Sequence, residues 1–306
     1  MGLKILITGA GGFIAQSLVK KLLKETEEPF VSSSLVLFDR AFHGQPKFDR
    51  VQYFSGDIND YAALRVLFLA NTFDVVVHLA GVLSKGESAE NAHLIERVNV
   101  SGTLNMALLC SEFHSKMIFF STGLVYGTMG KMPSQENMPC APAGFYALSK
   151  YLGEEIIRHQ ARTQNLIYTI FRPSVIYGPT QRGPMFIPSL IACAVKEKAF
   201  PMTLGEQTRD FIYIDDVVNA LCFALRNSMP GEYNLSSNCS RTIASVADVV
   251  AKWSAFDLKK GAIPYRNHET WDYRLDNSKL LLQGWQPLVK IETGLRTCFD
   301  SYKKGA

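Results

Sequence analysis

The chain has 306 residues, of which 47% are hydrophobic and 20% charged, and its formal net charge is +4. This length and balance indicate a globular protein with a large core, folded as one domain or as two closely associated ones. Basic runs are no longer than two residues, as at Lys259-Lys260, which excludes the basic tracts of nucleic-acid-binding proteins.

The N-terminal apolar run and the cysteines indicate where the protein works. The run at residues 4–7 is followed directly by glycines and is too short for a signal peptide or a membrane span. Six cysteines are scattered without a Cys-x-x-Cys pair, as expected for reduced, buried thiols in the cytosol. The six histidines show no metal-ligand spacing. We therefore expect a cytoplasmic protein without a metal site.

A short apolar strand is predicted at residues 3–7, followed by a glycine-rich turn and an amphipathic helix. This order of elements is typical of phosphate binding. Gly9 would make the tight turn, and Gly12 would let the backbone approach a pyrophosphate. The helix start, at Phe13 and Ile14, would supply amide donors and a positive dipole end.

The second predicted strand, residues 35–38, ends at Asp39. A carboxylate at this point can accept hydrogen bonds from both hydroxyls of an adenosine ribose, and it repels a 2′-phosphate. This favours NAD over NADP. Arg40 keeps NADP open, because a guanidinium beside the site offers a partner to a phosphate.

The third strand is predicted at residues 51–54, and the fourth begins at Asp74 and runs into a turn of small residues. His78, in the fourth strand, is expected to lie in the core with its hydrogen bonds satisfied. Ala80 and Gly81 allow a cofactor to approach the backbone closely.

Two helices are predicted on either side of the fourth strand, at residues 61–69 and 89–113. The second carries Asn99 within an apolar face. A buried amide requires a hydrogen-bond partner, so Asn99 is expected to have one.

A fifth strand, residues 117–120, leads to Thr122 at the edge where ligands gather in a doubly wound sheet. The following helix carries Tyr146 and Lys150, whose spacing of four residues places both side chains on one helix face. A nearby ammonium favours the phenolate and brings the pKa of the tyrosine from about 10 toward neutrality. The pair would then transfer a proton to or from a hydroxyl, although a solvated helix face also produces such pairs.

The alternation of strands and helices predicts a doubly wound parallel α/β sheet, a Rossmann fold, over residues 1–172. The glycine- and proline-rich stretch that follows predicts a smaller α/β substrate-binding lobe over residues 173–306, with some return of strand or helix to the first domain. Trp271 and Trp285 are expected in its core.

The motifs, taken in order, resemble those of the extended short-chain dehydrogenase/reductases. More narrowly, they are similar to the NAD-dependent epimerase/dehydratase family, in particular to UDP-glucose/UDP-galactose 4-epimerases. The matching residues run almost from end to end: Thr8-Gly9-x-x-Gly12-x-x-Ala15, Asp39, Gly56-Asp57, His78-Leu79-Ala80-Gly81, Asn99, Ser121-Thr122, Tyr126-Gly127, Tyr146-x-x-x-Lys150, Arg172-Pro173, Tyr177-Gly178-Pro179, Gln207-Thr208-Arg209-Asp210-Phe211, Ser278-Lys279 and Gly284-Trp285-x-Pro287.

The resemblance implies a role for each matching position. Tyr146 would be the acid/base, Lys150 would tune it, and Thr122 would hold the substrate hydroxyl. NAD would be bound by Gly9, Gly12, Phe13, Ile14, Asp39, Arg40, Asp57, Ile58, Leu79, Ala80, Gly81, Asn99, Tyr146 and Lys150. The substrate would contact Ser84, Thr122, Gly123, Tyr146, Arg209 and Arg274, the two arginines gripping its diphosphate. A homodimer through the helices at 89–113 and 145–162 is also implied.

Departures from the family pattern shape the functional hypotheses. Gly123 and Leu124 stand where the dehydratases carry an Asp-Glu pair, so elimination of water is disfavoured. Val175 replaces an asparagine that touches the substrate's diphosphate in many relatives. This departure favours a smaller substrate, whereas Arg209 and Arg274 favour a nucleotide sugar. We predict an NAD-dependent 4-epimerase of a nucleotide sugar. The alternatives are an NAD(P)-dependent dehydrogenase or reductase of a sugar, sugar acid or other small hydroxylated substrate, and a non-catalytic protein on this scaffold.

Overall fold

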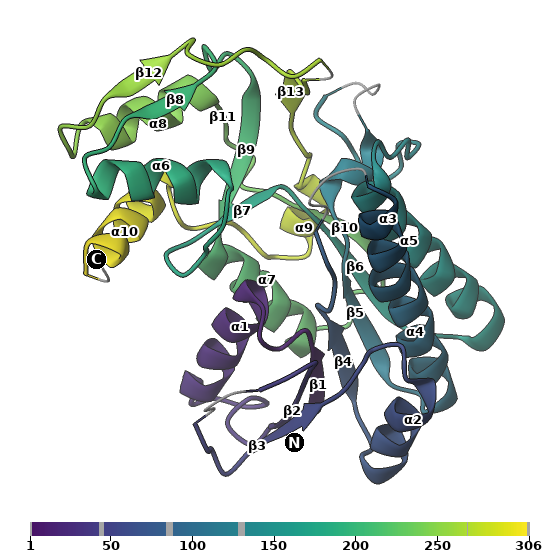
Figure 1. Cartoon of the computed structure of the whole chain (residues 1–306). Helices are drawn as coiled ribbons and strands as arrows, with labels where there is room; N and C mark the ends of the chain where they lie inside the picture. Colours follow the sequence, from purple (N-terminus) through teal and green to yellow (C-terminus); the bar gives the residue numbers. More distant parts are fainter. Residues whose placement is uncertain (1, 43–45, 84–87, 128–131, 268, 305–306) are drawn as a thin grey trace. The chain divides into compact units, whose positions relative to one another are not determined.

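The computed structural model describes the chain except for residues 1, 43–45, 84–87, 128–131, 268 and 305–306 (Figure 1). The chain divides into two compact units. The first unit comprises Met1–Met129, Pro139–Arg172 and Ala220–Tyr233, and the second comprises Gly130–Met138, Pro173–Asn219 and Asn234–Ala306.

The first unit is built on a seven-stranded sheet with the order β10-β6-β5-β4-β1-β2-β3. Its strands are β1 (Lys4–Thr8), β2 (Ser34–Asp39), β3 (Val51–Ser55), β4 (Val75–His78), β5 (Lys116–Phe120), β6 (Tyr168–Pro173) and β10 (Gly231–Leu235). The pairs from β3 across to β6 are all parallel. The order reverses between β1 and β4, which is the switch point where doubly wound sheets bind ligands. The predicted fold class is confirmed.

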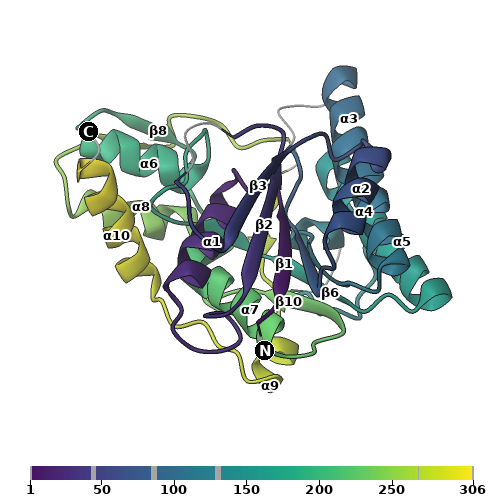
Figure 2. The ribbon, with the colours of Figure 1, turned by 90° about the horizontal axis from the view of Figure 1, so that it is seen from below.

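Helices cover both faces of this sheet (Figure 2). They are α1 (Phe13–Lys24), α2 (Tyr61–Ala70), α3 (Ala89–Ile95), α4 (Gly102–Glu112), α5 (Phe145–Gln164) and α7 (Ile214–Arg226), of which the last begins in the second unit. Helices α2, α4 and α5 lie on one face, and α1 lies on the other. Apolar residues at helical spacing explain the packing: Ala15, Leu18 and Leu22 give α1 one buried side.

The core between the sheet and α2, α4 and α5 contains a cluster of buried apolar side chains. The side chains of Leu6, Val76 and Phe119 from the strands, and of Met106 from α4, are fully buried. Burying such side chains contributes about 1.5–3 kcal/mol each. This packing fixes the ends of the central strands, where the predicted site residues stand.

The helix predicted at 89–113 is not continuous. A π-helix, η1 (Glu96–Ser101), separates α3 from α4, and Asn99 lies within it. A π turn adds a residue to the helical register, and such turns are frequent at functional sites. The sequence did not predict this π-helix, because the apolar residues before and after it recur at the spacing of a continuous α-helix.

The second unit contains two small sheets. Strand β9 (Thr208–Tyr213) pairs with three neighbours, β7 (Val175–Tyr177), β11 (Ser240–Thr242) and β13 (Asp272–Tyr273). Strand β8 (Phe200–Met202) pairs with β12 (Leu258–Lys260). The helices are α6 (Phe186–Val195), α8 (Ile243–Ala251), α9 (Ser278–Leu282) and α10 (Ile291–Lys304).

Three expectations need correction. The sequence predicts a helix near residues 189–198, but helix α6 begins at Phe186, because Pro188 is tolerated in the first turn of a helix. Trp285 is buried as predicted, whereas Trp271 is 53% exposed. The cysteines are all free, but Cys140 and Cys193 are only half-buried and Cys239 is exposed.

Among the helices of the described residues, none combines the length and the apolar character needed to cross a membrane.

Candidate active site

The glycine-rich turn after β1 packs closely against the turn that follows β4. Gly9 has φ +67°, and a Cβ there would lie 2.7 Å from the backbone of Ala80. Its carbonyl accepts the Gly12 N–H at 2.9 Å, which closes the turn. Helix α1 has no side-chain cap at Gly12, so the first N–H groups of the helix, at Phe13 and Ile14, have no side-chain acceptor at the cap. An uncapped helix start behind glycines fits the pyrophosphate of a dinucleotide.

Asp39, the last residue of β2, lies directly against this turn. Its Oδ2 accepts the Gly11 N–H at 2.8 Å, and its Oδ1 accepts the Arg40 N–H at 2.7 Å. The carboxylate therefore stands at the carboxyl end of β2, beside the glycine-rich turn, where the sequence predicts an adenosine ribose.

Asp57 and Ile58 follow β3 at the same edge of the sheet. Asn59 holds the pKa of Asp57 below its usual range through a backbone and a side-chain hydrogen bond, and the charges of Arg97 and Arg40 add to this effect. Ile58 is buried, and a Cβ on Gly102 would lie 2.8 Å from it.

His78 is a core histidine, as predicted. It is completely buried, and burial lowers its pKa to about 3, helped by the charge of Lys150. Its Nδ1 lies 2.7 Å from Thr8 Oγ1, and its Nε2 lies 3.1 Å from Thr103 Oγ1. The Thr103 hydroxyl donates its hydrogen to the Asn99 carbonyl at 2.6 Å, so the Thr103 oxygen must accept from the Nε2–H of His78. The Nδ1 of His78 then carries no hydrogen and accepts from the Thr8 hydroxyl.

The turn after β4 is fixed by that chain of hydrogen bonds. Thr8 Oγ1 accepts the Ala80 N–H at 3.2 Å, and the Thr8 carbonyl accepts the Leu79 N–H at 3.3 Å. A Cβ on Gly81 would lie 3.2 Å from Lys150 Nζ. The small residues predicted here therefore make room for the lysine as well as for a cofactor.

Asn99 has the buried partners that the sequence requires. Its Oδ1 accepts the Val82 N–H at 2.8 Å, and its Nδ2 donates to the Val82 carbonyl at 3.0 Å. The same Nδ2 donates to Ser149 Oγ at 2.9 Å, and Ser149 donates to the Tyr146 carbonyl at 2.8 Å. Asn99 therefore links the turn after β4 to the first turn of α5.

Tyr146 and Lys150 lie on successive turns of α5, and Lys150 is only 5% exposed. Lys150 donates from Nζ to the Phe120 carbonyl at 2.9 Å, and burial lowers its pKa to about 8 against the raising effect of Glu154. Burial raises the pKa of Tyr146 to about 12. The predicted fall in the tyrosine pKa is therefore wrong for the protein alone, because desolvation of the phenolate outweighs the nearby ammonium.

Thr122 stands at the end of β5 and is 7% exposed. Its Oγ1 accepts the Leu124 N–H at 3.2 Å and so caps a short 3-10 helix, η2 (Gly123–Tyr126). Gly123 is buried and Leu124 is 43% exposed, so neither position supplies a carboxyl group.

The predicted substrate residues of the second unit are engaged with carboxylates of that unit. Arg209, in β9, pairs with Glu269 at 2.6 Å and donates to the Thr270 carbonyl at 2.6 Å. Arg274 donates hydrogen bonds to both carboxylate oxygens of Asp272, at distances of 2.5–2.9 Å. Glu269 and Asp272 were missed from the sequence, where an acidic residue close to an arginine gives no signal of its own. The predicted substrate residue Ser84 lies outside the described residues.

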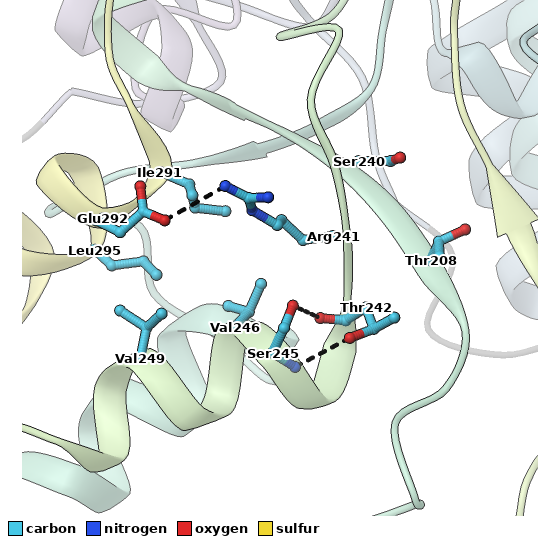
Figure 3. A pocket seen from close by; sticks show the side chains of 10 residues that line it. All are labelled: Thr208, Ser240, Arg241, Thr242, Ser245, Val246, Val249, Ile291, Glu292 and Leu295. Carbon is cyan, nitrogen blue, oxygen red and sulfur yellow. Dashed lines mark hydrogen bonds and ion pairs between the residues drawn. The ribbon is translucent and has the colours of Figure 1, made fainter.

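The second unit also contains an open cavity of about 400 Å³ (Figure 3). Arg241 points across it toward Glu292, and their charged groups are 3.5 Å apart. Its lining comprises Thr208, Ser240, Arg241, Thr242, Ser245, Val246, Val249, Ile291, Glu292 and Leu295. None of the residues predicted to bind cofactor or substrate is among them.

The geometry can be compared with known proteins. The sequence model of the NAD dependent epimerase/dehydratase family matches residues 5–236, which is most of the chain. The chain belongs to this family. The match confirms the resemblance drawn from the motifs, and the family is NAD-dependent, as the sequence predicts.

Relatives within the family are similar over nearly their whole length. The chain is 29% identical to a putative UDP-glucose 4-epimerase of Methanocaldococcus jannaschii, covering 95% of this chain and 96% of that protein. It is 27% identical to the mouse dTDP-D-glucose 4,6-dehydratase, covering 98% and 89%. The solved UDP-glucose 4-epimerase of Thermotoga maritima, crystallised with UDP-glucose, aligns with a TM-score of 0.89 at 25% identity, covering 100% and 99%.

Proposed function

We propose that the protein is an NAD-dependent 4-epimerase of a nucleotide sugar. The observation that carries the proposal is the buried Lys150, held beside the Gly81 turn and one helical turn from Tyr146. This is an arrangement for hydride and proton transfer at a hydroxyl-bearing carbon. The similar UDP-glucose 4-epimerases support the choice of reaction and substrate.

The residues of the first unit fit an NAD molecule. The turn at Gly9 and Gly12 is packed so closely against the backbone that neither position has room for a larger side chain, and the uncapped start of α1 follows it. Asp39 would accept the ribose hydroxyls once it releases the Gly11 N–H. Bound NAD⁺ would supply the hydride acceptor. The other proposed contacts come from Phe13, Ile14, Arg40, Asp57, Ile58, Leu79, Ala80, Gly81 and Asn99.

The chain's own residues would move the proton. Tyr146 would take the proton from the sugar hydroxyl as that carbon is oxidised, and it would return the proton after the keto-sugar has presented its other face. With a pKa near 12 in the protein alone, Tyr146 is a phenol at neutral pH and must lose its proton to solvent before it can act as the base of the forward step. The Lys150 ammonium would stabilise the Tyr146 phenolate, which the forward step consumes and the return step forms again. Thr122 would hold the substrate oxygen.

Dehydration is disfavoured by the residues after Thr122. The family's dehydratases need a carboxyl pair there, and this chain has Gly123 and Leu124. Neither can donate or accept a proton, so a 4,6-elimination by that route lacks its acid and base. Epimerisation needs no group beyond those already assigned.

A net dehydrogenase or reductase is the second candidate, and the arginines of the second unit favour it. Arg209 and Arg274 are both neutralised by carboxylates, Glu269 and Asp272. A diphosphate would have to displace these carboxylates, whereas an uncharged sugar would not. Val175 adds to this reading, because it offers no hydrogen bond to a phosphate.

We further propose that the protein forms a homodimer through α3, α4 and α5. Leu94, Leu104, Leu148 and Leu152 on these helices are each 39–45% exposed. Apolar side chains on adjacent helices fit a second copy of the same surface. Light scattering should give twice the chain mass, and Leu148→Asp together with Leu152→Asp should give the monomer mass.

The experiment that separates the two candidates is mass analysis of nucleotide released from the purified protein by denaturation, with no cofactor added. An epimerase regenerates NAD⁺ in every cycle and has no need to release it. We expect NAD⁺ at about one per chain. An empty site would favour the net dehydrogenase, and bound NADP would contradict the role given to Asp39.

A further inference from the structure

A buried ion pair between Glu154 and Arg172 lies in the first unit, and the proposed mechanism does not use it. Their side chains are 0% and 2% exposed. Arg172 donates from Nη2 to Glu154 Oε2 at 2.6 Å and from Nε to Oε1 at 3.0 Å, which makes a two-point contact. Arg158 adds a hydrogen bond to Oε2 at 2.5 Å. Desolvation largely offsets the attraction of so deep a pair, so stability alone is a weak reason for it.

The pair is connected to the Thr122 segment at both ends. Ser121, the residue before Thr122, donates from Oγ to Glu154 Oε1 at 2.5 Å. Tyr126, the last residue of η2, accepts from Arg172 Nη1 at 2.9 Å. The Arg172 guanidinium carbon also lies 4.9 Å from the centroid of the Tyr126 ring. Thr122 therefore lies between two residues that are anchored to one ion pair.

Glu154 also belongs to the helix that carries the other two proposed catalytic residues. It follows Lys150 by four residues and Tyr146 by eight, which places all three on one side of α5. The negative charge of Glu154 raises the pKa of Lys150, whereas burial lowers the same pKa by a larger amount. Among the other groups beside Lys150, His78 is neutral at working pH, because burial lowers its pKa to about 3.

We propose that the Glu154–Arg172 pair positions Thr122 relative to Tyr146 and Lys150, and that Glu154 supports the ammonium form of Lys150. The inference rests on the proposed function, which assigns those three residues to the chemistry. Neither Glu154 nor Arg172 is expected to touch the substrate, so both are positioning residues. A displacement of about 1 Å between reacting groups lowers a rate by up to about 100-fold, so an ion pair that fixes the position of Thr122 has a large effect on the rate.

The charge part is tested by Glu154→Gln, with Glu155→Gln as the matched control. Glu155 is the next residue of α5 and also pairs with Arg158, at 2.6 Å, but it is 43% exposed. The titration of Lys150 is followed by NMR of its ¹³Cε, assigned with Lys150→Arg, and needs no substrate. Removing the carboxylate should move the midpoint to lower pH by about half a unit or more, and the control should not move it. An unchanged midpoint in Glu154→Gln would overturn this part.

The positioning part is tested by Ser121→Ala and Tyr126→Phe, which each remove one connection and leave the ion pair in place. We expect kcat to fall by about 10- to 100-fold, with KM changed by less than about threefold and a protein that still unfolds cooperatively, although the lost hydrogen bond lowers its thermal midpoint. Wild-type kcat in both variants would overturn it. Ser121→Ala and Tyr126→Phe also test the positioning role of the ion pair if Glu154→Gln does not fold. Absence of any activity toward nucleotide sugars would contradict the proposed function, while the Lys150 titration would still test the inference.

Discussion

Lys150 donates from Nζ to the carbonyl oxygen of Phe120 at 2.9 Å, which ties α5 to the last residue of β5. The acceptor is a backbone atom, so the sheet itself fixes the position of the ammonium. Thr122 follows Phe120 by two residues, and the Gly81 turn lies on the other side of the same lysine. The proposed catalytic groups are thus placed by a strand end and a helix rather than by long loops.

Tyr146→Phe removes the proposed proton-transfer group and little else. We expect kcat to fall by about 100- to 10,000-fold, because the remaining ring cannot exchange a proton with the sugar hydroxyl. The fold should be unaffected, since the Tyr146 ring is partly exposed. Steady-state kinetics and a thermal melt check both statements. Tyr151→Phe, on the next turn of the same helix, is the control and should keep its activity. An active Tyr146→Phe would show that the acid/base lies elsewhere.

Lys150 should make the stability of the fold depend on pH in a defined window. Burial lowers its pKa from 10.5 to about 8, so between these values the unfolded chain binds more protons than the folded one. Stability should then rise with pH across this window, because the burial penalty of the charge is relieved. Lys150→Met lacks the effect, so its stability relative to wild type should fall from pH 8 to pH 10.5.

Urea denaturation of both proteins at several pH values measures that difference. Lys116→Met is the control, because Lys116 is exposed at the start of β5. Its stability relative to wild type should not change across the window. A Lys150→Met difference that stays constant with pH would mean that Lys150 keeps its ordinary pKa in the fold.

Gly9→Ala should destabilise the first unit and weaken NAD binding. The methyl group would lie 2.7 Å from the Ala80 backbone, and the φ of +67° is unfavourable for alanine. Strain and overlap together should cost about 2–5 kcal/mol. Gly261→Ala isolates the strain, because its φ is +77° but a Cβ there meets only the Leu204 side chain, at 3.2 Å. Thermal midpoints and calorimetric NAD titration compare the two. Equal losses in both variants would contradict the close approach at Gly9.

Asp39→Ala should relax the choice between the two dinucleotides. The Asp39 carboxylate would bind the ribose hydroxyls of NAD and repel the 2′-phosphate of NADP. Its removal should raise the ratio of NADP to NAD affinity by at least about tenfold, which corresponds to about 1.4 kcal/mol. Binding titrations with both dinucleotides measure the ratio. The exposed Asp49→Ala serves as the control, and an unchanged ratio in Asp39→Ala would remove Asp39 from the ribose site.

The sequence predicted the sheet well because its strands are short apolar runs between helices of clear periodicity. The turn at Gly9, the position of Asp39 and the burial of His78 followed from local pattern, since each depends on residues close in the chain or on strand ends. The π-helix at Asn99 did not, because its apolar flanks fit a continuous α-helix. Its signal was the polar residue itself, which had to find a partner in Val82 and Ser149.

The electrostatics of the site could not be predicted from spacing alone. The spacing of four residues from Tyr146 to Lys150 suggested a lowered tyrosine pKa, but the direction of the shift depends on how much protein surrounds each group. The Glu154–Arg172 pair joins residues 18 positions apart, and only the packing of α5 on the sheet brings them together. The one local indication of the pair was Glu154, a carboxylate four residues after Lys150 in the sequence.

The measurement that tests the central claim most directly is ¹H NMR of UDP-glucose incubated with the purified protein and no added cofactor. The proposed mechanism predicts that the anomeric signal of UDP-galactose grows until the two epimers reach equilibrium, because the hydride taken from C4 returns to the same carbon. An oxidised sugar formed only on addition of NAD⁺, with an equal amount of NADH, would contradict it and identify a net dehydrogenase.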